Sequence, residues 1–196
     1  MRKLMLAAVA AMVLAVAATP AQAGIDEGEW EVALSGEYFL SEAHDNLGFQ
    51  ITIGYFVTAE IEIGGWFAYH RQELDFDLTD GGGDFEIEKT WWDVAVFISW
   101  NFNTDGDWTP YIGVFIGSES AELDLDGDDV DRGGFMWGGF VGVRFWIHDN
   151  CAIFFEYRLL IRSEDEWDID DSSSDVDDDG VAHRFAVGFS LLFGGA

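Results

Sequence analysis

Apolar and polar residues alternate with a period of two near the end of the chain. Between residues 181 and 193 the odd positions, apart from His183, carry bulky apolar side chains. The even positions carry mostly small or polar side chains, together with Arg184. Successive side chains of a β-strand point to opposite faces, so this alternation predicts a strand whose two faces meet different surroundings.

The same alternation appears in seven earlier segments. It predicts strands at about residues 29–40, 47–57, 61–78, 85–102, 109–123, 135–147 and 153–162. In the third segment the apolar positions change parity after Arg71, which predicts a β-bulge. Connections near residues 58, 105 and 149 are short, whereas those near residues 45, 82, 128 and 173 are generally longer, with an acidic loop expected at residues 124–131. This arrangement is typical of membrane barrels, so the predicted fold class is all-β, an eight-stranded antiparallel up-and-down transmembrane β-barrel.

Charged residues on the predicted strands indicate which face meets lipid. Six of them lie opposite the aromatic face and form a predicted interior charge network: Asp93, Arg144, Glu156, Arg158, Arg162 and Arg184. A cation on the lipid face at mid-bilayer costs about 2–4 kcal/mol, whereas inside a narrow barrel it can pair with an acid. The alternative is a soluble lipocalin-like barrel with its charged face outside. That alternative leaves the aromatic residues at the strand ends unexplained.

The start of the chain predicts export. Residues 1–23 read as a signal peptide, with Arg2 and Lys3 before an apolar run and Ala21-Gln22-Ala23 as a cleavage site. A transmembrane anchor is the alternative, but the run is short for a full span. The predicted mature domain is residues 24–196, located in the outer membrane.

Charge and cysteine content exclude some functions. The formal net charge is −29, and removal of the signal peptide makes it more negative still. Binding to nucleic acid is therefore not expected, since phosphate contacts need Lys and Arg. Cys151 is the one cysteine, so no internal disulfide can form.

Three short motifs carry a resemblance to a known family. The end of the chain, Gly188-Phe-Ser-Leu-Leu-Phe193, resembles the signal that the barrel-assembly machinery recognises. The segments at residues 109–114 (Thr-Pro-Tyr-Ile-Gly-Val) and 155–158 (Phe-Glu-Tyr-Arg) resemble strand patterns of the same proteins. The mature chain is thus similar to the small outer-membrane barrels of the OmpA, OmpX and OmpW type. The resemblance implies a monomer in contact with outer-membrane lipid and lipopolysaccharide.

The predicted function follows from the narrow interior. Eight strands enclose a space that side chains can fill, so we expect a structural or surface-interaction role without a steady pore. The alternative is a narrow porin-like passage for small cations or small apolar solutes, as OmpW-type proteins suggest. An enzyme is not expected, because no nucleophile stands beside an evident base.

One acidic segment offers a metal-binding hypothesis. Asp175, Asp177 and Asp179, followed by Gly180, match the opening of a calcium loop, although the twelfth position is Ala186 and not Glu. A solvated acidic loop is the simpler interpretation of the segment. The more specific interpretation is weak calcium binding at the outer surface, where the ion could bridge the acidic loop to lipopolysaccharide phosphates. No other cofactor is expected.

Overall fold

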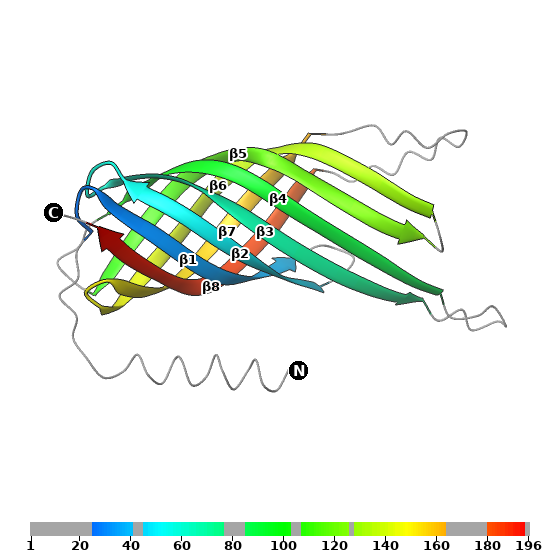
Figure 1. Ribbon diagram of the computed structural model, residues 1–196, viewed down its shortest axis with the longest axis horizontal. Coiled ribbons are helices and arrows are strands. Elements are labelled where there is room, and N and C mark those ends of the chain that lie inside the picture. The colour runs from blue at the N-terminus through cyan, green and yellow to red at the C-terminus, as the bar shows by residue number, and fades with distance from the viewer. Residues whose placement is uncertain are drawn as a thin grey trace.

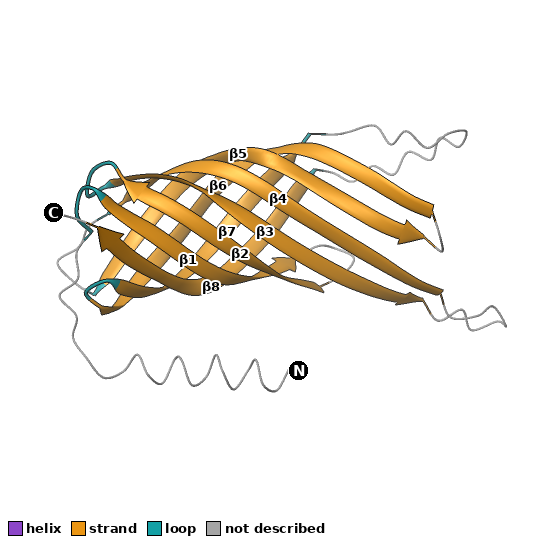
Figure 2. Ribbon diagram, in the orientation of Figure 1, coloured by secondary structure: helices purple, strands orange, loops and turns teal. Residues whose placement is uncertain are grey.

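Eight strands form one closed antiparallel barrel. The computed structural model describes residues 25–40, 45–76, 85–102, 107–125, 128–163 and 180–194. The strands are β1 (Glu29–Leu40), β2 (Asp45–Phe56), β3 (Ile61–Phe76), β4 (Phe85–Asn101), β5 (Trp108–Leu125), β6 (Asp128–His148), β7 (Cys151–Arg162) and β8 (Val181–Gly194). Each strand pairs with its neighbours in sequence, and β1 pairs with β8 to close the barrel (Figures 1 and 2). Within the described ranges there is no helix with the length and apolar character needed to cross a membrane. The predicted fold class is confirmed.

The register fixes the tilt of the strands. From His183 in β8, successive register partners can be followed through β7, β6, β5, β4, β3 and β2 to Trp30 in β1, which pairs with Phe193 in β8. This path returns to β8 ten residues from its start, between His183 and Phe193. With a rise of about 3.4 Å per residue and a tilt of about 40°, His183 lies roughly 25 Å above Phe193 along the barrel axis.

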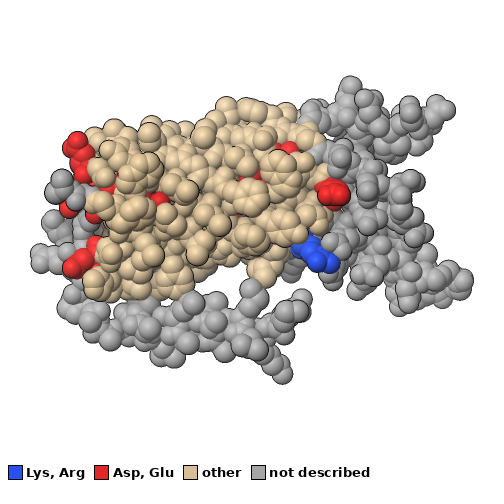
Figure 3. All heavy atoms as spheres, in the orientation of Figure 1, with Lys and Arg blue, Asp and Glu red and all other residues tan. Residues whose placement is uncertain are grey.

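The barrel is apolar outside and polar inside. On β5, Val114 faces outward with 58% of its surface exposed, whereas its neighbour Phe115 faces inward and is 4% exposed. Charged side chains such as Glu37 and Arg184 are fully buried. In Figure 3 the middle of the barrel wall is mostly uncharged, and exposed acidic side chains gather at its ends. The soluble lipocalin-like alternative is therefore wrong, because water would meet a continuous apolar wall.

Aromatic side chains form a belt at each end of this wall. One belt lies at the end where β1 begins and β8 ends, here called the turn end, and includes Trp30, Trp100, Trp108 and Phe193. The other belt lies at the opposite end, here called the loop end, and includes Tyr38, Tyr69, Trp92 and Trp137. Such belts mark the two boundaries of a membrane-spanning barrel.

Two expectations for the strands are wrong. The acidic segment at 124–131 is mostly a continuation of β5 and β6, which stay paired up to Leu125 and Asp128. Backbone pairing does not depend on side-chain charge, so acidic residues can extend a hairpin beyond the apolar wall. No bulge occurs in β3, since its register with β4 is unbroken up to Phe76. The change of parity follows the last β2–β3 pair, at Arg71, beyond which the outward face no longer has to be apolar.

A charge placed on the outer wall tests this orientation. Val114→Arg, midway between the belts, should lower the free energy of unfolding in lipid vesicles by about 2–4 kcal/mol, because the guanidinium would lie in hydrocarbon. The matched control is Ser118→Arg, on the same strand and face but level with the loop-end belt. We expect a much smaller loss there. Equal losses in urea titrations would contradict the proposed depth of the wall.

Candidate functional site

The candidate site is the barrel interior, where charged side chains form two clusters. The turn-end cluster consists of Glu31, Glu62, Ser99, Asn101 and Arg144, and the loop-end cluster consists of Glu37, Gln50, His70, Asp93, Glu119, Glu156, Arg158, Arg162 and Arg184. Each cluster draws on several strands. Alternation along each strand points these side chains inward, and the register brings them to the same depth.

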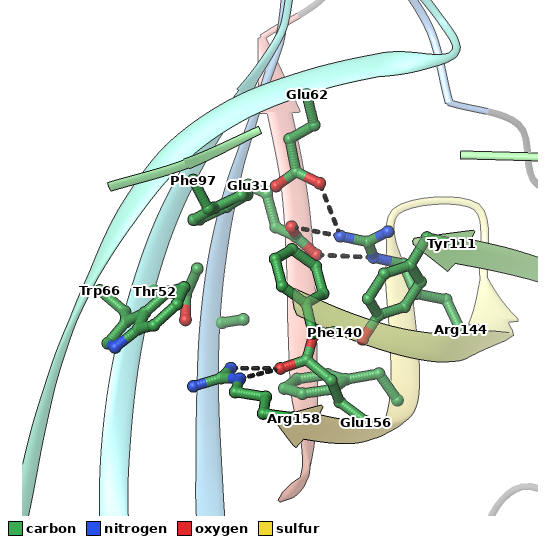
Figure 4. Close-up of a pocket in the computed structure, with 12 residues that line it drawn as sticks. Glu31, Thr52, Glu62, Trp66, Phe97, Tyr111, Phe140, Arg144, Glu156 and Arg158 are labelled. Atoms are coloured by element: carbon green, nitrogen blue, oxygen red, sulfur yellow. Dashed lines mark hydrogen bonds and ion pairs between the residues drawn. The ribbon is translucent and has the colours of Figure 1, made fainter. Parts of the chain in front are cut away.

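Arg144 organises the turn-end cluster. Its Nε and Nη2 donate to the two carboxylate oxygens of Glu31 at 3.0 and 2.7 Å, a bidentate pair that Figure 4 shows. Nη2 also donates to Glu62 at 2.9 Å, and Nη1 donates to Asn101 at 2.5 Å. The Tyr111 ring covers the guanidinium with its centre 4.4 Å from Cζ. One arginine thus holds two buried carboxylates and leaves little room for water.

An aromatic layer lies between the turn-end cluster and most of the loop-end cluster. It consists of the inward rings of Trp66, Phe97, Phe115 and Phe140. The centres of the three phenylalanine rings lie 4.8–6.4 Å from that of Trp66. Arg158 bridges from this layer to the loop-end cluster, since its Cζ lies 4.3 Å from the Trp66 ring. The layer therefore blocks the axis of the barrel with side chains from four different strands.

The loop-end cluster is a continuous network of ion pairs. Arg158 contacts Glu156 and Gln50 closely and donates to Glu37 at 3.0 Å. Arg184 donates to Asp93 at 2.6 Å and to Glu119 at 3.2 Å. In addition, Arg162 donates to Glu119 at 2.9 Å, and Trp66 Nε1 donates to Asp93 at 2.8 Å. These contacts join seven of the eight strands, namely β1, β2, β3, β4, β5, β7 and β8.

His70 lies between two acids of this network. Its Nε2 is 3.4 Å from a Glu37 oxygen and 3.5 Å from an Asp93 oxygen, and its ring stacks on Trp91 with centres 5.0 Å apart. Gly48 makes room for it, because a Cβ at that position would overlap the imidazole. Among the described inward groups, six carboxylates face four guanidinium groups, so the interior carries an excess of acidic side chains.

The interior leaves little empty space. The cavity between the turn-end cluster and the aromatic layer has a volume of about 30 Å³ and is lined by Glu31, Glu62, Glu156, Arg144 and Arg158 among others (Figure 4). A volume of this size accommodates about one water molecule. Among the described side chains at this depth, the space that this cavity offers is too small for a solute.

The sequence-predicted site residues fall into two groups. The structure places Asp93, Arg144, Glu156, Arg158 and Arg184 in buried inward positions and Arg162 in a half-buried one at the loop end. The network also contains Glu31, Glu37, Glu62, Glu119 and His70, which were not predicted from the sequence, although their parity along each strand is the same signal that selected Asp93. The predicted calcium residues Asp175, Asp177 and Asp179 lie outside the described residues.

A comparison with protein families identifies the barrel. The family model of the outer membrane protein beta-barrel domain matches residues 8–193. The chain belongs to this family. Its location is therefore the outer membrane. A search of the curated proteins finds no match.

Solved structures of the same fold agree with this assignment. Neisserial surface protein A is similar with a TM-score of 0.61 and 14% identity, over 84% of this chain and 96% of that one. Ail of Yersinia pestis has a TM-score of 0.55 and 16% identity, over 85% of this chain and 99% of that one. OprG of Pseudomonas aeruginosa has a TM-score of 0.58 and 10% identity, over 89% of this chain and 100% of that one. At these identities the likeness shows the fold alone.

The role of Arg144 can be tested by removing its charge. Arg144→Met should lower the free energy of unfolding in vesicles by about 3–5 kcal/mol, because it leaves Glu31 and Glu62 buried without their cation. Adding Glu31→Gln and Glu62→Gln to this variant should restore part of the loss, since neutral amides need no counter-charge. The control is Arg71→Met, an exposed outward arginine, which should change stability little. An equal loss in both single variants would contradict the interior pairing.

Proposed function

We propose that this chain is a closed outer-membrane barrel with a structural or surface-interaction role and no steady conductance. The packed interior is the observation that carries the proposal. Two ion-paired clusters and an aromatic layer occupy the axis. The cavity between the turn-end cluster and the aromatic layer has a volume of only about 30 Å³. Opening such an interior would break several buried ion pairs at once, which is costly because each separated charge stays buried.

Membership of the family supports a further proposal about the surroundings of the barrel. We propose that residues 1–23 are removed on export and that the loop end faces the cell exterior. Its partners would be outer-membrane lipid, lipopolysaccharide and, during insertion, the barrel-assembly machinery, which would read the final strand. We propose a monomer that binds no nucleic acid and has no catalytic role. Calcium binding by Asp175, Asp177 and Asp179 stays a prediction.

One observation favours the second candidate, a narrow passage for small cations. The described interior carries more carboxylates than guanidinium groups, and an acidic interior attracts cations. A passage of this kind would require the aromatic layer and the arginine pairs to move aside. Conductance separates the two candidates directly.

Planar-bilayer recordings of the folded protein should show little or no steady conductance, because side chains block the axis. The double variant Trp66→Ala with Phe140→Ala removes two rings of the aromatic layer and should produce more frequent openings. Heat-dependent mobility on gels would verify that both proteins are folded. A reproducible open level in the unaltered protein would contradict the closed barrel, and cation selectivity of that level would support the passage.

A further inference from the structure

The lipid-facing wall contains a groove that crosses β4, β5, β6 and β7 and reaches the start of β3. Its volume is about 720 Å³, within the range of small-molecule sites. The outward side chains that line it are Ile61, Ile98, Trp100, Ile112, Val114, Val141, Tyr157 and Leu159, together with Gly139. The groove is therefore walled almost entirely by hydrocarbon and aromatic groups.

Gly139 creates the hollow. It occupies an outward position in β6 between Trp137 and Val141, and its register partners on either side are Val114 and Leu159. All four neighbours carry large apolar side chains, so the missing side chain leaves a gap among them. The backbone does not require a glycine there, since an added Cβ would meet only the carbonyl oxygen of Gly113 at 3.4 Å, an ordinary contact. The gap is thus a feature of the surface and is not imposed by the packing of strands.

A polar pair stands at the loop-end side of the groove. Tyr157, which lines the groove, is hydrogen-bonded through its hydroxyl to His183 Nδ1 at 2.7 Å, and the two rings are stacked with centres 6.0 Å apart. His183 is also the register partner of Leu159, another lining residue. By the tilt of the strands His183 lies roughly 25 Å above Phe193, which is about the height of the apolar band. The pair therefore lies where lipid headgroups begin.

The chemistry of the pair suits an anionic headgroup. When the Tyr157 hydroxyl donates to Nδ1, the other ring nitrogen of His183, Nε2, carries the hydrogen, and in the imidazolium form it does so as well. The side chain of His183 is exposed, so this N–H can donate to a phosphate oxygen outside the wall. Apolar lining below and a donor at headgroup depth together match one phosphate-headed lipid.

We propose that this groove binds one phosphate-headed lipid of the surrounding membrane, with an acyl chain along Gly139 and a phosphate at His183. The occupant is a lipid because the groove opens onto the wall that faces the bilayer. The inference is independent of whether the interior conducts, since every lining group used here is on the outer wall.

Native mass spectrometry of the mature barrel released from detergent micelles tests the proposal. Phosphatidylglycerol is titrated as the probe, and diacylglycerol with the same chains is the comparison that lacks phosphate. Gly139→Leu fills the groove and should weaken phosphatidylglycerol binding by about tenfold or more. The matched control is Gly36→Leu, at another outward glycine, where an added Cβ meets nothing within 4 Å. That variant should bind as the unaltered protein does.

Variants of Tyr157 and His183 test the recognition of the phosphate separately from the fit of the acyl chain. His183→Ala and Tyr157→Phe should reduce the preference for phosphatidylglycerol over diacylglycerol, because both lipids keep the acyl-chain contacts and only one offers phosphate. Heat-dependent gel mobility would show that each variant is folded. Equal phosphatidylglycerol binding by Gly139→Leu and Gly36→Leu would overturn the proposal. It would also be overturned if Gly139→Leu abolished self-association and left lipid binding unchanged, because the groove would then be an interface between copies.

Discussion

Backbone N–H and C=O groups that lie in hydrocarbon must all be paired, and the remaining features of this barrel depend on that constraint. Pairing of β1 with β8, from Glu29 and Gly194 to Leu40 and His183, removes the two edges that an open sheet would expose to lipid. Closure with eight strands leaves an interior that side chains fill. Charged groups placed there lose most of their hydration, so each has to find a partner among the others.

The interior ion pairs also specify the register. Arg144 and Glu31 are 113 residues apart, and they meet only if every strand between them is correctly aligned. A slip of one residue would turn an inward charge toward lipid and an outward aromatic residue into the interior. The pairs contribute little net stability compared with apolar packing, but breaking one is costly. Their main physical effect is to disfavour misaligned barrels. The outer wall is under a different demand, since it must suit lipid, and there a missing side chain such as that of Gly139 is tolerated.

Alternation along the strands was sufficient to predict the fold and the inward direction of Asp93 and Arg184. It could not predict that Arg184 pairs with Asp93 and Glu119, because partners from distant strands are set by the offset of ten residues around the barrel. The acidic segment at 124–131 was misread as a loop because charge describes exposure to water and not backbone pairing. The bulge expected after Arg71 was wrong for a related reason, since parity carries information only where lipid lies on one face.

Nitrogen-15 NMR of the arginine side chains tests most directly whether the interior is dry and paired. In the structure, the Nε–H groups of Arg144 and Arg158 donate to Glu31 and Glu156 inside the barrel, whereas the Arg71 side chain is exposed. Paired and buried N–H groups should exchange slowly with water, so separate, long-lived signals are expected for Arg144 and Arg158 and rapid exchange for Arg71. Exchange of all three at the same rate would mean that water fills the barrel, and it would contradict the closed interior on which this account rests.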